Sequence, residues 1–205
     1  MLAMTIGIDS ASLSSAAKVV RDGGIVAFPT DTVYGLACDP WSETAVDRLF
    51  EAKRREDRPI PVLCVDSVEA ESVVSFNETA LDLVKRFWPG ALTIVAPLKR
   101  TVPHRLDQGS GWLGVRVPDH RAARELARLS GGFITGTSAN VSGRPSCTTA
   151  AEVSGSLGDR IDAIIDGGPS PGGASTVVKV VGGSIEVLRR GLIAVETGIT
   201  RESNR

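Results

Sequence analysis

The chain has 205 residues, of which 42% are apolar, and its 23 basic and 24 acidic side chains give a formal net charge of −1. This length suits one domain of generous size or two small ones, and the apolar fraction suffices for a core without metal or disulfide staples. The charge balance excludes a protein that coats nucleic acid by charge alone, although it is compatible with a local basic groove.

The three cysteines, Cys38, Cys64 and Cys147, are widely spaced and odd in number. They match neither a disulfide framework nor the spacing of zinc ligands, so we interpret each as a small buried hydrophobe in a reducing compartment. Segment 1–10 lacks the charged and apolar regions of a signal peptide, and no apolar run approaches the ~20 residues that span a bilayer. We therefore expect a soluble, cytoplasmic protein without membrane contact.

Helix-like and strand-like periodicities alternate along the chain, which predicts an α/β layered fold. A helix is expected over 13–20, where apolar residues recur at helical spacing before Gly23 and Gly24. A short buried strand follows at 25–28. Ser42 is suited to cap a helix whose apolar stripe runs over 45–50.

The remaining elements continue this alternation. After a strand at 60–65, Asn77 is suited to cap a helix that Pro89 and Gly90 close. The side chains expected to point inward from that helix are Ala80, Leu81, Val84 and Trp88. A further helix is predicted at 121–129, and strands at 92–98, 113–117, 133–137, 161–165, 176–181 and 184–188. Without a repeat or linker, we expect one domain over 1–205, with its core at about 10–195 and a frayed tail at 200–205.

The first polar motif, Pro29 to Leu36, follows directly after the strand at 25–28. Ligands bind at strand ends in α/β proteins, and the side chains of Thr30, Asp31, Thr32 and Tyr34 can hydrogen-bond a small polar molecule there. The alternative is an ordinary turn, in which these side chains satisfy the local backbone.

Cations cluster in the segment from Lys53 to Pro59, at the end of the second predicted helix. The helix dipole favours cations at this end, so a solvated charge run is one reading. The other reading is the capture of phosphate or carboxylate oxygens by lysine and arginine.

Arg116 lies within an apolar predicted strand. Strand alternation places Arg116 and Gly114 on one face and the neighbouring apolar side chains on the other. The alternative is an arginine at the edge of a half-exposed sheet. Because Gly114 leaves space beside it, we interpret Arg116 as a partner for a carboxylate or phosphate.

Two further segments are rich in small polar residues. In the segment from Thr137 to Ser146, small side chains let backbone N–H groups approach an anion, although a plain polar loop is the alternative. The segment 175–178 follows glycines between 167 and 173, and Arg189, Arg190 and Gly191 come near the end. No lysine-bearing P-loop is present, so any nucleotide is held in another way.

The sequence lacks the residues that two kinds of chemistry would require. His104 and His120 are the only histidines, and neither lies near another potential ligand in the sequence, which argues against a metal built into the protein. No Ser-His-Asp or Cys-His spacing supports a nucleophile. The remaining interpretation is a cation-rich site that positions anions for reaction with each other.

Together these segments resemble the YrdC-like threonylcarbamoyl-AMP synthase family. The family's motifs correspond, in order, to Pro29–Leu36, Lys53-Arg54-Arg55 followed by Pro59, Arg116, Ser138–Ser146, Ser175–Val178 and Arg189. The resemblance runs from about residue 23 to residue 193. It implies a twisted, mixed sheet flanked by helices, with a concave, positively lined cavity.

The resemblance also implies an activity: an L-threonylcarbamoyladenylate synthase, a nucleotidyltransferase that converts L-threonine, bicarbonate and ATP into threonylcarbamoyl-AMP and pyrophosphate. Mg²⁺ arrives with ATP, and a separate transferase uses the product on the adenosine beside the anticodon of tRNA. The implied threonine contacts are Thr32, Arg116, Gly136 and Ser175. The implied ATP contacts are Arg55, Arg58, Ser138, Ser146 and Arg189. Lys53 and Arg55 are the implied catalytic residues, and Lys53 helps to hold bicarbonate or phosphate.

The chain departs from the family pattern at several positions. Leu63 lies where some relatives have histidine, Trp112 lies where a small hydroxylic residue is common, and Arg190 replaces a proline. Arg58 stands where some relatives carry asparagine. The chain also resembles a short form that lacks the extra C-terminal domain of longer relatives.

Two rival functions remain open at this stage. One is a double-stranded RNA-binding or ribosome-maturation module without nucleotidyl transfer, for which tRNA or duplex RNA is the partner. Arg121, Arg124 and Arg128 share a face of the predicted helix, but we interpret this as a solvated face. The other is a carbamoyl-transfer domain of the hydrogenase-maturation kind, whose zinc-finger and acylphosphatase-like parts have no counterpart in this sequence.

Overall fold

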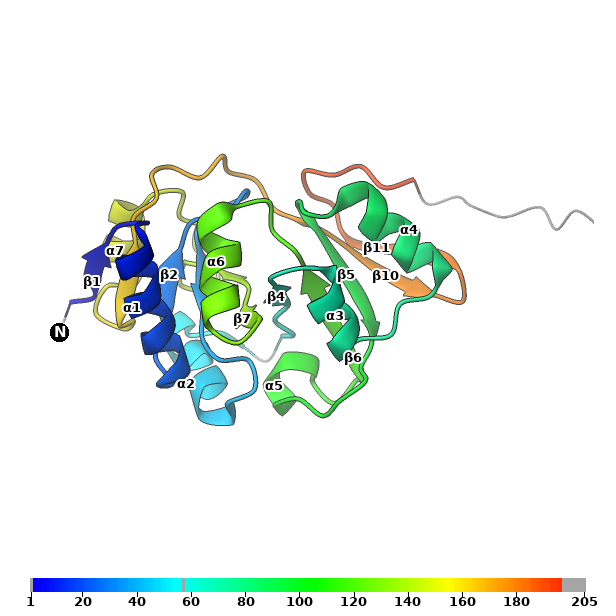
Figure 1. Ribbon diagram of the computed structural model, residues 1–205, viewed down its shortest axis with the longest axis horizontal. Helices are drawn as coiled ribbons and strands as arrows, with labels where there is room; N and C mark the ends of the chain where they lie inside the picture. Colours follow the sequence, from blue (N-terminus) through cyan, green and yellow to red (C-terminus); the bar gives the residue numbers. More distant parts are fainter. Residues whose placement is uncertain (1, 57, 197–205) are drawn as a thin grey trace, which may run out of the picture.

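A computed structural model describes residues 2–56 and 58–196 of the chain (Figure 1). The helices are α1 (Ser10–Arg21), α2 (Glu43–Lys53), α3 (Ser67–Val73), α4 (Glu78–Phe87), α5 (His104–Asp107), α6 (Arg121–Leu129) and α7 (Ala150–Leu157). The strands are β1 (Met4–Ile6), β2 (Val26–Phe28), β3 (Gly35–Ala37), β4 (Val62–Cys64), β5 (Leu92–Pro97), β6 (Trp112–Arg116), β7 (Phe133–Thr135), β8 (Thr137–Ser138), β9 (Ala163–Ile165), β10 (Thr176–Val181) and β11 (Ser184–Arg189).

The strands form two mixed sheets, and the predicted α/β class is confirmed. One sheet has the order β1-β9-β2-β3-β8, and the other has the order β11-β10-β5-β6-β4-β7. The division into two sheets differs from the single sheet expected from the sequence. It arises because the predicted strand at 133–137 breaks at Gly136, so that β7 pairs with β4 and β8 pairs with β3.

The helices cover the sheets by burying apolar stripes. The stripes of α1 and α6 pack in one cluster with β2, β9 and Ile134, and the two helices contact each other (Figure 1). The apolar side of α4 packs on β5 and β10 at the other end of the molecule. A central cluster joins side chains of both sheets, including Ala27 and Leu36 from one and Val62 and Val115 from the other. This core fixes the two sheets relative to each other.

Local sequence signals placed several elements correctly. The side chains of Ser42 and Asn77 accept hydrogen bonds from the backbone N–H groups of Ala45 and Ala80, as expected of helix N-caps. The predictions for 121–129 and 176–181 coincide with α6 and β10. The three cysteines are buried and free, which confirms their interpretation as small hydrophobes.

Other predictions were wrong or incomplete. Leu83, not Leu81, is buried in α4. Trp88 follows the helix, which ends at Phe87, but packs against the core as predicted. The expected tail at 200–205 lies outside the described residues. The sequence-based prediction omitted β1, β3, α3, α5 and α7, all of which are short, and merged β7 with the start of β8. Among the described residues no helix is long and apolar enough to cross a bilayer.

Candidate active site

Most of the predicted site residues converge beside strands of the six-stranded sheet. A cavity of about 560 Å³ opens there, between that sheet and the loops that lead to the other sheet. Eight of the predicted residues line it: Thr32, Arg55, Arg116, Gly136, Ser138, Ser146, Ser175 and Arg189. The other two, Lys53 and Arg58, line a neighbouring cavity of about 440 Å³, which shares Arg55 and Ser138 with the first.

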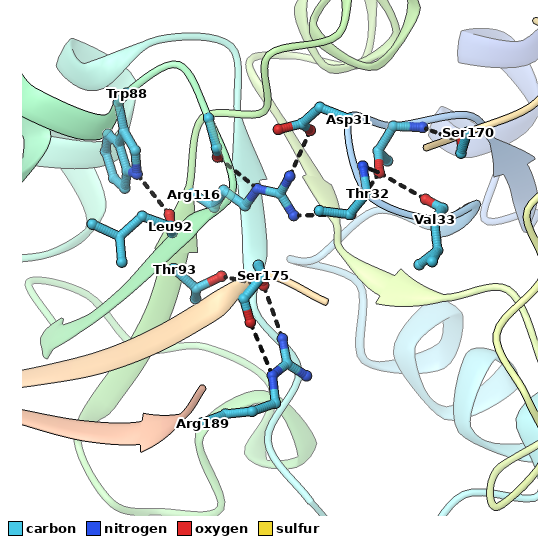
Figure 2. A network of polar contacts seen from close by, with 12 residues as sticks. Asp31, Thr32, Val33, Trp88, Leu92, Thr93, Arg116, Ser170, Ser175 and Arg189 are labelled. Carbon is cyan, nitrogen blue, oxygen red and sulfur yellow. Dashed lines mark hydrogen bonds and ion pairs between the residues drawn. The ribbon is translucent and has the colours of Figure 1, made fainter. Parts of the chain in front are cut away.

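Arg116 is held firmly at one end of the main cavity (Figure 2). Its Nη2 lies 2.5 Å from Oδ1 of Asp31, and its Nε donates to the carbonyl oxygen of Gly90 at 2.9 Å. Its Nη1 faces the Oγ1 of Thr32 at 3.4 Å. The side chains of Arg116 and Asp31 are only 6% and 15% exposed. The guanidinium is therefore fixed by groups behind it, as a rigid carboxylate- or phosphate-binding fork requires.

The threonines of the first motif are ordered by their own loop. Thr30 Oγ1 donates to the carbonyl oxygen of Val33 at 2.7 Å and lies 2.9 Å from Oγ1 of Thr32. The backbone N–H of Gly172 donates to the carbonyl oxygen of Thr32 at 2.7 Å, which joins this loop to the glycine-rich segment. Both readings of the motif hold in part: Thr30 satisfies the local turn, while Thr32 lines the cavity.

Ser175 and Arg189 form a second polar group on the cavity wall (Figure 2). Arg189 donates from Nη2 to Oγ of Ser175 at 2.8 Å and from Nε to its carbonyl oxygen at 3.0 Å. Oγ of Ser175 also lies 3.2 Å from Oγ1 of Thr93. Partial burial and the nearby Arg116 lower the pKa of Arg189. Cations that are held near each other favour an anion between them.

Arg55 reaches the cavity because α2 ends abruptly. Arg54, which caps α2, adopts a left-handed conformation with φ of 48°, and the N–H of Arg55 donates to the carbonyl oxygen of Phe50 at 2.9 Å. Arg55 donates to the carbonyl oxygens of Arg58 and Pro59, at 3.3 Å and 3.2 Å. Burial, followed by the charges of Arg58 and Arg189, lowers the pKa of Arg55. An arginine remains a cation at neutral pH even so.

Lys53 differs from the exposed cations beside it. It is only 1% exposed, and its Nζ donates to the carbonyl oxygens of Ser138 and, at 2.8 Å, Asn140. Burial, together with the charge of Arg55, lowers its pKa to about 7. The reading as a solvated charge run therefore fits Arg54 and Arg58, which are exposed, and fails for Lys53. The lysine fixes the backbone of the loop that begins at Ser138.

Several cavity residues had not been assigned a role from the sequence. Thr93, Lys179 and Trp112 line the main cavity, and Asn140 lines the neighbouring one. Oδ1 of Asn140 is buried and has no hydrogen-bond partner among the described residues. Strand alternation was the available signal for Thr93 and Lys179, because each is a polar side chain within an apolar strand.

The chain as a whole is similar to known proteins. A family model for the Sua5, YciO and YrdC domain, described as telomere recombination, matches residues 18–191. The chain is 40% identical over 193 residues to the threonylcarbamoyl-AMP synthase of Bacillus subtilis (strain 168), covering 93% of this chain and 54% of that protein. It is 36% identical over 190 residues to the putative threonylcarbamoyl-AMP synthase of Mycobacterium tuberculosis (strain H37Rv), covering 91% of this chain and 87% of that protein.

One solved structure is also similar to this chain. The crystal structure of P. abyssi Sua5 complexed with L-threonine superposes with a TM-score of 0.88 at 38% identity, covering 93% of this chain and 58% of that one. The chain belongs to the Sua5, YciO and YrdC family. It spans about half the length of the B. subtilis relative and of the P. abyssi structure.

Proposed function

We propose that this protein is an L-threonylcarbamoyladenylate synthase, which forms threonylcarbamoyl-AMP and pyrophosphate from L-threonine, bicarbonate and ATP. The observation that carries the proposal is the convergence of eight predicted contact residues on one cavity with two cationic ends. Arg116 lies at one end and Arg55 at the other. The relatives named for this activity and the P. abyssi structure with L-threonine support the same reading.

Threonine is assigned to the end of the cavity that holds Arg116. Its carboxylate would face the Nη1 side of Arg116, which Asp31 leaves available, with Thr32 and Ser175 as hydroxyl partners. Leu63 packs beneath Gly136: a methyl group added at Gly136 would lie 2.6 Å from Cδ2 of Leu63. The backbone of Gly136 can therefore line the threonine side of the cavity, while the Leu63 side chain supports it from behind.

ATP is assigned to the other end. Arg55, Ser138, Ser146 and Arg189 would contact the nucleotide from the main cavity, and Arg58 would contact it from the neighbouring one. Lys53 would act mainly by holding the backbone at Ser138, since both described partners of its amine are carbonyl oxygens. Mg²⁺ would arrive with ATP. The described residues contain no cluster of His, Cys, Asp and Glu that could hold a metal, so phosphate oxygens would supply its main ligands.

The proposed reaction has two steps. The free amine of threonine adds to bicarbonate with loss of water, which gives a carbamate. A carbamate oxygen then attacks the α-phosphorus of ATP, so that a new P–O bond forms and the bond to pyrophosphate breaks. Both reactants are anions, and Arg55 and Arg189 would offset their repulsion in a partly buried site. Positioning alone can supply roughly 7–11 kcal/mol of acceleration without a covalent enzyme intermediate.

The product would pass to a separate transferase that modifies the adenosine beside the anticodon of tRNA. The rival function, binding of tRNA or double-stranded RNA without nucleotidyl transfer, requires a surface of exposed cations. On α6, Arg128 is paired with Glu125 at 2.7 Å, which neutralises part of the face that the rival would use. The synthase reading accounts for the buried cations, which an RNA-coating surface does not require.

Release of pyrophosphate from ATP tests the proposal. We expect release only when both threonine and bicarbonate are present, and weaker release with serine, which lacks the methyl group. Arg55→Ala should abolish most turnover while the Tm changes little, and Arg54→Ala, at the neighbouring exposed position, is the matched control. Turnover in Arg55→Ala that equals the wild type would refute the assignment. Absence of release under every combination would favour the RNA-binding function, which salt-dependent gel shifts with structured RNA would then test.

A further inference from the structure

The main cavity continues along the sheet beyond the residues assigned to threonine. Lys179 on β10 pairs in register with Glu186 on β11 and with Val95 on β5, and Val95 pairs with Gly114 on β6. All four residues line the cavity. This row crosses four strands and reaches β6 at Gly114, which lies between Trp112 and Arg116 in the sequence of that strand.

Trp112 lies two residues before Gly114 on β6 and also lines the cavity. It is the one aromatic residue among the described residues that line the cavity, and it is half-buried. The Nζ of Lys179 lies 4.2 Å from the centroid of its ring, within the range of a cation–π contact. Apolar side chains of Val95, Val177 and Leu188 line the same region. One face of the Trp112 indole therefore contacts the side chain of Lys179, which also lines the cavity.

The backbone next to Trp112 is held in place. The carboxylate of Asp107 accepts hydrogen bonds from the N–H groups of Gly109 and Gly111, each at 3.0 Å. Oγ of Ser110 donates to the carbonyl oxygen of Trp112 at 3.3 Å and accepts from its N–H at 3.2 Å. A tight turn of this kind presents the indole as a preformed surface.

We infer that Trp112 is the platform on which the purine base of the nucleotide stacks. The inference rests on the proposed function, because it requires a nucleotide whose phosphates lie near Arg55 and Arg189. A base has apolar faces that bind flat aromatic or aliphatic surfaces, and Trp112 offers the flat one in this cavity. The base replaces the Lys179 ammonium over the ring, and the ammonium is then free to donate to a ring nitrogen of the purine. Trp112 is thereby a specificity-determining residue for the nucleotide.

Binding measurements with separated parts of the nucleotide test this inference. The affinities of the full chain for AMP, ATP and inorganic tripolyphosphate are measured by calorimetry, for the wild type and for Trp112→Ala, Trp112→Phe and Trp41→Phe. Stacking is worth ~1–3 kcal/mol per base, which at about 1.4 kcal/mol per tenfold corresponds to roughly a 5- to 140-fold loss of affinity. We expect this loss for AMP and ATP in Trp112→Ala, with tripolyphosphate affinity unchanged, and near-complete recovery in Trp112→Phe.

Fluorescence supplies an independent readout. AMP should quench the tryptophan emission of the wild type and of Trp41→Phe, because Trp41 packs against Phe133 and Arg100 and does not line the cavity. The quenching should disappear in Trp112→Phe although AMP still binds. Unchanged AMP affinity in Trp112→Ala, or an equal loss of tripolyphosphate affinity, would overturn the inference.

The inference and the proposed function can fail separately. If the wild type binds AMP through Trp112 but releases no pyrophosphate, the base site stands and the synthase assignment fails. If pyrophosphate is released and Trp112→Ala leaves the KM for ATP unchanged, the synthase assignment stands and the base platform is refuted.

Discussion

Replacement of the buried lysine gives the most informative perturbation of this protein. In Lys53→Met the side chain keeps its approximate length and loses the amine that binds the carbonyl oxygens of Ser138 and Asn140. In the folded protein, burial and the charge of Arg55 lower the pKa of Lys53 from its ordinary value of 10.5 to about 7. A neutral amine retains two N–H donors, which match the two carbonyl oxygens. The contacts can therefore persist after deprotonation.

The sign of the pH effect follows from these two pKa values. Between pH 7 and 10.5 the unfolded chain holds a proton at Lys53 that the folded protein has lost. The free energy of unfolding therefore rises with pH between pH 7 and 10.5. Below pH 7 the lysine is charged in the folded protein as well, and the full cost of burying that charge lowers the stability. The total amounts to roughly 5 kcal/mol at about 1.36 kcal/mol per pKa unit, of which about 3 kcal/mol falls between pH 6 and pH 9.

Urea unfolding at several pH values measures this effect. The free energy of unfolding is determined at pH 6, 7, 8 and 9 for the wild type, for Lys53→Met and for Lys85→Met, a control at an exposed position of α4. We expect the difference between wild type and Lys53→Met to move by about 3 kcal/mol in favour of the wild type as the pH rises. The Lys85→Met control should run parallel to the wild type. Parallel curves for Lys53→Met as well would refute the reasoning.

Two further predictions concern the cavity walls. Gly136→Ala should destabilise the protein by about 1–3 kcal/mol, because its methyl group would lie 2.6 Å from Leu63. In a Leu63→Ala background this penalty should largely vanish, and a double-mutant cycle that shows no coupling would contradict the clash. Asp31→Ala should lower the Tm, because it leaves the buried Arg116 without its 2.5 Å ion-pair partner. Added threonine should then raise the Tm of Asp31→Ala more than that of the wild type, and an equal or smaller rise would count against carboxylate binding at Arg116.

Much of the local structure could be predicted from the sequence. Helix caps at Ser42 and Asn77 depend on residues three positions apart, and the cavity-facing side of β6 follows from alternation between Gly114 and Arg116. The capping box that opens α7, formed by Thr149 and Glu152, was also readable, although the prediction omitted that helix. These features are local, so the neighbouring residues suffice to specify them.

The roles of individual site residues depended on contacts between distant segments. Lys53 lies in a run of cations, yet its amine meets carbonyl oxygens 85 and 87 positions further along the chain. Arg116 meets Asp31 across 85 positions, and Trp112 meets Lys179 from another strand.

By itself, the sequence determined the α/β class, several helix caps and most of the polar segments that contribute to the cavity. Only the tertiary structure decided that the strands divide into two sheets at Gly136, which cations are buried and what each one holds. The physical reason is that burial and charge pairing depend on the packing of the whole chain, whereas caps and strand alternation depend on a few consecutive residues.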